Sequence, residues 1–213
     1  YGRVQLQYHA ATRLLCMTAV GHAMILLSTD IQEDVLDDLT NFAQCINSPL
    51  KSLFVRFYLL RALFPYPCTN HRTAFTFVMT NTVEATRAVL RHINSHRNDV
   101  EDIEEMCFPL KEIYLNMVNC TLFTEDLLLE EVIPIILGEI VNATMDFSKP
   151  VVLSTLIQSL SPSLLHKALK SVVTAIQQLG LEDTYTLIGN VIKVMATTHV
   201  SKEDYQELVY VVE

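Results

Sequence analysis

Hydrophobic residues recur with helical spacing along nearly the whole chain, and residues 48–64 show this most clearly. Two adjacent apolar surfaces run along this stretch, one formed by Leu50, Leu53, Phe54, Phe57, Leu60 and Phe64 and the other by Val55, Leu59, Ala62 and Leu63. Its only charges, Lys51, Arg56 and Arg61, are five residues apart, which rotates each by about 140° from the last. They therefore share no polar face, and the pattern predicts that other helices lie on both flanks of this one.

The same periodicity predicts further helices, bounded by prolines and by Ser or Thr caps. We expect a helix at residues 3–27, where a break near 9–12 stays open, and others at 31–45, 72–92, 100–118, 125–141, 149–160, 164–179 and 183–197. A last helix is expected after the capping sequence at 201–204. Pro109 predicts a kink or a fresh start, and Pro134 a kink. Ser148 is expected to cap one helix, and Gly180 to end another in the left-handed conformation.

These helices form pairs of about 40 residues, which is the size of a HEAT-type repeat. The pattern therefore predicts an all-α fold, a HEAT-like α-solenoid of about ten antiparallel helices. We expect residues 1–213 to form a single segment of a longer solenoid, and the rival architecture is a closed helical bundle. In the solenoid, Arg56 is expected to be the least exposed charge of its helix and to meet a carboxylate or a helix C-terminus from an adjacent repeat.

Composition narrows the class of protein. Half of the residues are hydrophobic while glycine is scarce, which favours helices over sheets. A net charge of −9 with scattered basic residues argues against nucleic-acid binding. Five cysteines without a CxxC pair indicate reduced thiols in the cytoplasm. The most apolar run, residues 14–27, is shorter than the ~20 residues that span a bilayer, so a buried helix is expected there and no direct membrane insertion.

A zinc site is the first candidate for hidden chemistry. Cys68 and His71 precede His92 and His96 with a spacing that resembles a set of zinc ligands. However, Cys68 lies next to prolines, and an imidazole near a helix C-terminus is explained by the helix dipole. We therefore expect no metal and no cofactor, and keep a small helical metal-binding protein as an alternative.

Catalysis finds no support in the sequence. No nucleophile elbow, zinc-protease motif or phosphate-binding glycine loop is present. Two pairs of adjacent carboxylates, Glu104–Glu105 and Glu130–Glu131, point about 100° apart on a helix and cannot act as one acid–base pair. The chain is therefore not expected to be an enzyme.

Arg13 is the most conspicuous single charge. It is the only charged residue between Arg3 and Asp30, and it stands beside the most apolar run of the chain. Contact with a partner subunit and internal pairing with a carboxylate explain this placement equally well.

Four motifs, in the same order and spacing, resemble the vacuolar protein sorting-associated protein 35 family, the large scaffold subunits of retromer. Residues 48–60, SPLKSLFVRFYLL, resemble the family's H-P-L-R-G-L-F-L-R-x-Y-L-L. Residues 12–21 resemble its P-R-L-Y-L-M motif with the continuation towards a T-x-G, although Thr12, Leu15 and Cys16 depart from it. Residues 136–142 resemble I-L-x-x-V-V-N, and residues 156–162 resemble I-I-Q-V-F-P. The likeness covers residues 5–198 and the N-terminal to middle portion of the family.

The resemblance implies a non-enzymatic scaffold of an endosomal coat that sorts and recycles membrane cargo, cytoplasmic and peripheral on endosomal membranes. In the family the arginine motif supports binding of the arrestin-fold subunit, vacuolar protein sorting-associated protein 26; by position, Arg13, Leu14 and Met17 match it. The motif at residues 48–60 supplies a structural signature, Pro49, Leu50, Phe54, Arg56 and Tyr58. Further implied partners are sorting nexins, a Rab-type GTPase and a small phosphoesterase-fold subunit that binds the family's C-terminal half. Another HEAT-like adaptor, of retriever or nuclear-transport type, is the alternative within the same architecture.

Overall fold

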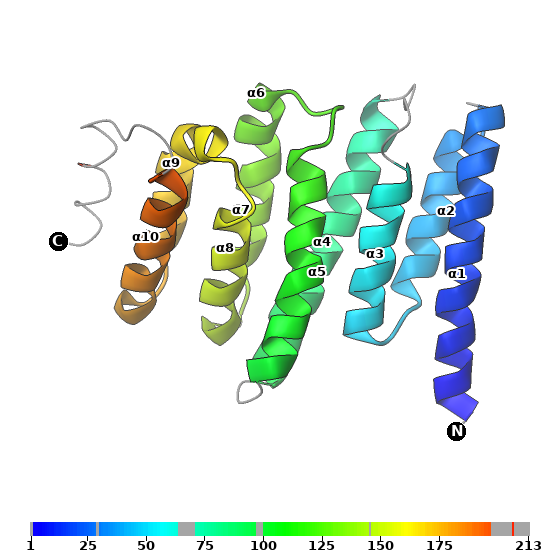
Figure 1. The fold of residues 1–213 in the computed structure, drawn as a ribbon, viewed down its shortest axis with the longest axis horizontal. Coiled ribbons are helices and arrows are strands. Elements are labelled where there is room, and N and C mark those ends of the chain that lie inside the picture. Colours follow the sequence, from blue (N-terminus) through cyan, green and yellow to red (C-terminus); the bar gives the residue numbers. More distant parts are fainter. Residues whose placement is uncertain are drawn as a thin grey trace.

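The computed structural model describes residues 2–28, 30–63, 71–96, 100–144, 146–196 and 206, and within them all regular structure is helical. Figure 1 shows the helices standing side by side in one row, with α1 and α10 near opposite ends. The elements are α1 (Gly2–Leu27), α2 (Gln32–Gln44), α3 (Pro49–Leu63), α4 (His71–Ser95), α5 (Val100–Val118), α6 (Glu125–Leu127), the π-helical turn η1 (Leu128–Val132), α7 (Ile133–Val141), the 3-10 turn η2 (Asp146–Ser148), α8 (Lys149–Ile157), α9 (Pro162–Gln177) and α10 (Leu181–Met195).

The helices form two layers. In the first layer α1, α3, α5, α8 and α10 each contact the next, and in the second α2, α4, α7 and α9 do the same. Consecutive helices connect the layers, as α1 does with α2 and α3 with α4. This stacking of helix pairs along one axis confirms the predicted all-α, solenoid-like fold. It also confirms the expectation for α3, which lies between α1 and α5 with α4 behind it.

A continuous core fills the space between the layers. It extends from Leu14 in α1 to Met195 in α10. Each helix contributes a stripe; in α9 the stripe consists of Leu165, Leu169, Val172 and Ile176, all buried. Because each stripe meets only neighbouring helices, the core is elongated rather than central.

Prolines shape two helices in different ways. α5 runs through Pro109 without a fresh start. Before Pro134 the helix widens into the π-helical turn η1 and then continues as α7. A proline ring clashes with the carbonyl four residues earlier, here that of Glu130, and a wider turn relieves such a clash. The irregularity predicted at Pro134 is therefore a π turn.

The sequence left a break near residues 9–12 open, and the structure shows that α1 is continuous there. Other expected helix ends are wrong. Ser148 makes no capping hydrogen bond with its side chain, because it ends the turn η2 and is already helical. Gly180 has a φ of −67° and is the N-cap of α10, so that α9 ends at Gln177 without a left-handed residue. The helix predicted at 164–179 begins two residues earlier, at Pro162, since proline suits the first helical position.

Two helices begin at a side-chain cap, and the cap at Thr124 agrees with the predicted helix start at residue 125. Thr124 Oγ1 accepts a hydrogen bond from the Leu127 N–H at 3.2 Å, and Ser161 Oγ accepts one from the Leu164 N–H at 3.2 Å. Successive first-layer helices begin at Pro49, Val100 and Lys149. The repeat length measured between these starts is therefore longer than the ~40 residues of a HEAT-type repeat. The last predicted helix, after 201–204, lies outside the described residues except for residue 206. Within those residues no helix has the length and apolarity needed to cross a bilayer.

Candidate functional site

Arg13 lies on the exposed surface of α1. Its guanidinium carbon is 6.0 Å from the centre of the Phe42 ring on α2. This is the distance of a cation–π contact, which orients the side chain without removing it from solvent. The contact is with an aromatic ring rather than with the carboxylate that internal pairing would supply.

The other two residues of the arginine motif are less accessible. Leu14 is only 2% exposed and belongs to the core, and Met17 is half-buried and packs against it. Of the three, Arg13 alone is presented to solvent. Leu14 instead fixes the rotation of α1 about its axis, and this rotation places Arg13 outwards.

The face of α1 that carries Arg13 is apolar. Val20, Met24 and Leu27 lie 7, 11 and 14 residues after Arg13, on the same stripe, and Val20 is 58% exposed and Leu27 87% exposed. The expectation of a buried helix at residues 14–27 is therefore wrong for this face. α1 stands near the end of the row, where helices α2 and α3 cover its opposite side only.

The predicted structural signature divides between surface and core. Pro49 is the first residue of α3 and Leu50 is half-buried beneath it. Phe54 and Tyr58 are one turn apart and both exposed, although Phe54 was expected on the core stripe. Arg56 is 3% exposed, which confirms that it is the most buried charge of its helix.

Arg56 is held by a chain of hydrogen bonds across three helices. Its Nη1 donates to Asn81 Oδ1 on α4 at 2.7 Å. Asn81 Nδ2 in turn donates to the Phe77 carbonyl at 2.9 Å and to Thr40 Oγ1 on α2 at 3.3 Å. The predicted carboxylate or helix C-terminus is thus replaced by an amide. Sequence reasoning missed Asn81, because an uncharged amide within a helix carries no distinctive pattern.

The electrostatics of Arg56 are those of an incompletely compensated charge. Burial lowers the pKa of its guanidinium, and the charge of Glu84 acts in the opposite direction. The Nε atom is buried and has no hydrogen-bond acceptor among the described residues. Arg56 therefore retains donor capacity beyond its bond to Asn81.

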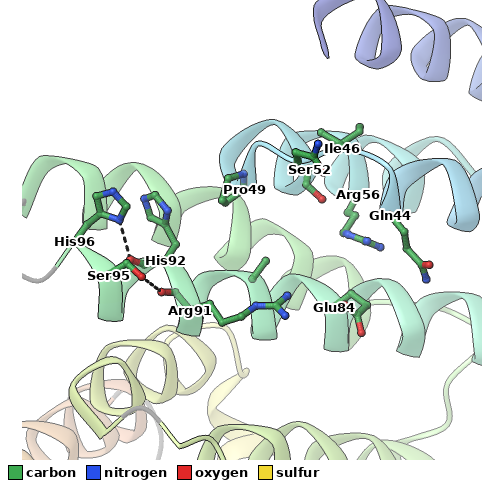
Figure 2. Close-up of a pocket in the computed structure, with 12 residues that line it drawn as sticks. Gln44, Ile46, Pro49, Ser52, Arg56, Glu84, Arg91, His92, Ser95 and His96 are labelled. Carbon is green, nitrogen blue, oxygen red and sulfur yellow. Dashed lines mark hydrogen bonds between the residues drawn. The ribbon is translucent and has the colours of Figure 1, made fainter. Parts of the chain in front are cut away.

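A pocket of about 540 Å³ opens beside Arg56. Figure 2 shows Arg56 reaching from α3 towards α4, between Gln44 and Glu84, with Arg91 further along α4. The rim is completed by Ile46, Asn47 and Pro49 near the start of α3, and by the end of α4. There the rings of His92 and His96 stack with their centres 4.2 Å apart.

The residues considered for zinc do not form a metal site in the described part of the chain. No group of three His, Cys, Asp or Glu side chains converges there. His92 and His96 face each other, whereas Cys68 and the side chain of His71 lie outside the described residues.

Comparison with known proteins adds no further constraint: no family model and no curated protein matches this sequence.

Proposed function

We propose that this chain is a non-enzymatic scaffold of a retromer-type endosomal coat and that it binds an arrestin-fold subunit through α1. The observation that carries the proposal is the outward Arg13, at the position where the sequence resembles the family's arginine motif and on a stacked helical array. The proposal includes sorting nexins and a Rab-type GTPase as further partners, and a peripheral location on endosomal membranes.

The surface around Arg13 has the composition of a protein interface. Interface centres are enriched in arginine and in large apolar side chains, and depleted of other charges. Val20, Met24 and Leu27 provide the apolar part, and between Arg3 and Asp30 Arg13 provides the only charge. The contact with Phe42 restricts the arginine before a partner arrives, which lowers the entropy lost on binding.

The test is charge reversal at Arg13. Arg13→Glu should abolish co-precipitation of an arrestin-fold subunit, because a carboxylate would face the acceptor that Arg13 is proposed to meet. The matched control is Arg61→Glu. Arg61 is also exposed and also lies over a ring, with its guanidinium carbon 5.8 Å from the centre of Phe57, but on α3.

The control variant should bind as the unmodified chain does, and both variants should keep their helical circular dichroism. Retained binding by Arg13→Glu contradicts the assignment of the site. Co-purification from cell extract tests the wider proposal. Recovery of import cargo or of retriever-type subunits, without retromer subunits, would show that the chain is another HEAT-like adaptor and not a retromer-type scaffold.

A further inference from the structure

We propose that the pocket between α3 and α4 binds a carboxylate group of an acidic peptide, with Arg56 and Arg91 as the residues that recognise it. The proposal concerns a second site, separate from the surface around Arg13.

The first argument is the state of Arg56. A guanidinium has five N–H donors, and burying it is costly unless they find acceptors. Arg56 is 3% exposed, yet the structure shows one strong bond, from Nη1 to Asn81, and leaves Nε without an acceptor. Glu84 acts on it through its charge only, without a direct hydrogen bond. An acceptor entering the adjoining pocket would complete the coordination of this group.

The second argument is that Arg56 is already oriented. The hydrogen bonds from Asn81 to Thr40 and to the Phe77 carbonyl fix the amide that holds the guanidinium. A side chain held by helices α2, α3 and α4 loses little further freedom when a ligand binds. Such preorganisation is typical of a recognition site rather than of an incidental surface charge.

The third argument concerns the charge of the lining. Arg56 and Arg91 provide two positive groups and Glu84 one negative group, so the pocket is basic in a chain whose net charge is −9. The N-terminal end of α3, at Pro49, adds partial positive charge to the rim. A group with negative charge is therefore the favoured occupant.

The remaining lining selects a peptide carboxylate over a phosphate. Glu84 would repel a dianion, but it can accept a hydrogen bond from a peptide N–H. Gln44, Asn47 and Ser52 offer neutral donors and acceptors to a peptide backbone. The volume of about 540 Å³ lies within the range of sites that take a few residues of an extended chain.

The experiment is fluorescence polarisation with the 213-residue chain and three labelled tetrapeptides. The first is acetyl-Glu-Glu-Asp-Glu-amide, the second its neutral counterpart acetyl-Gln-Gln-Asn-Gln-amide, and the third the neutral peptide with a free C-terminal carboxylate. We expect the first or the third to bind and the second not to. Which of the two binds more tightly identifies side-chain or C-terminal carboxylate as the source of the recognised group.

Variants locate the site. Arg56→Met and Arg91→Gln should each weaken binding by about tenfold or more, the effect of losing a charged hydrogen bond. Glu84→Gln should strengthen it by removing a repulsive charge. Arg61→Gln is the matched control, since Arg61 is on α3 but outside the pocket, and it should leave affinity unchanged. If Arg56→Met fails to fold, the affinity of the Arg91→Gln variant decides whether the pocket is the binding site, because Arg91 is exposed and its replacement should leave the fold intact.

Three outcomes overturn the proposal. The first is that no peptide binds at about 1 mM, the weakest specific affinity worth assigning. The second is that Arg61→Gln weakens binding as much as Arg91→Gln, which would indicate non-specific attraction. The third is that inorganic phosphate or a phosphorylated peptide binds while the acidic peptides do not. None of these depends on α1, so Arg13→Glu can fail its own test while this one succeeds.

Discussion

At the scale of single residues, Arg56 shows how a buried charge is accommodated in a helical array. Removing a guanidinium from water costs several kcal/mol, which must be offset by good hydrogen bonds. Asn81 supplies the direct acceptor, and its own amide hydrogens are used by Thr40 and by the Phe77 carbonyl. Asn81 therefore satisfies polar groups on both of its sides and is the central residue of this network.

Replacing Asn81 should be more damaging than its size suggests. Asn81→Ala leaves a buried cation without its acceptor, and we expect a loss of about 2–4 kcal/mol in the free energy of unfolding, measured by urea denaturation. The control is Asn116→Ala. The Asn116 amide donates to the Glu112 carbonyl of its own helix at 2.8 Å, so its loss should cost less than about 1 kcal/mol. Equal losses in the two variants would contradict a central role for Asn81.

The sequence predicted the burial of Arg56 but not its partner. Charges spaced five residues apart share no polar face on a helix that is covered on most sides. The Val55–Arg56 pair, which resembles the second helices of HEAT repeats, indicated which of them would be least exposed. The partner depends on which helices meet at that level, and this information is not local. The pocket follows from the same meeting of α3 and α4 and was not predicted for the same reason.

At the scale of elements, Gly21 sets the distance between α1 and α2. A Cβ atom at this position would lie 2.8 Å from Val35 Cγ1 and 3.3 Å from Leu39 Cδ1. Val35 is β-branched and cannot easily turn away. Gly21 is therefore required for the close approach of the two helices, and its backbone conformation needs no left-handed φ.

Two glycine substitutions should have opposite effects. Gly21→Ala should lower the free energy of unfolding by about 1–2 kcal/mol, because overpacking outweighs the helix preference of alanine. In Gly189→Ala, in α10, the added Cβ meets no described residue within 4 Å, and the variant should raise the free energy of unfolding by about 0.5–1 kcal/mol. Thermal or urea unfolding of the two variants measures both. A stabilising Gly21→Ala would mean that α1 and α2 can separate without cost.

Most helices could be predicted from periodicity, because a long amphipathic stripe is a strong signal. Their ends were predicted less well, and the reasons are specific. Gly180 is suitable both for ending α9 and for beginning α10, and only the packing of the two helices selects the second role. The exposure of the apolar face of α1 was not predicted. An apolar run indicates a surface suited to packing, but it does not show whether a neighbouring helix covers that surface.

At the scale of the whole molecule, stability is built from neighbouring pairs. In the described residues α1 packs on α2 and α3, and α10 packs on α8 and α9. In such arrays the free energy is approximately a sum of helix-pair and interface contributions. The two ends of the row are therefore expected to unfold separately, unlike the parts of a closed bundle.

Hydrogen exchange of the Gly21→Ala variant tests this behaviour. Backbone amides of α1 and α2 should exchange faster than in the unmodified chain, whereas those of α9 and α10 should keep their rates. The mirror variant is Val191→Ala, which opens a cavity at a fully buried position in α10 and should show the reverse pattern. Uniform acceleration along the chain in either variant would identify one cooperative unit.

The hydrogen bonds of Arg56 have a mechanical consequence. Arg56 on α3 bonds to Asn81 on α4, and Asn81 bonds to Thr40 on α2, so that the first pair of helices is joined to the second. An apolar contact between helices yields gradually, since side chains slide past one another, but a hydrogen bond weakens steeply with distance and angle. Bending of the array between these two pairs should therefore be stiff at small deflections and give way abruptly at larger ones. Bending at this joint should therefore also change the shape of the pocket beside Arg56, because α3 and α4 both line it.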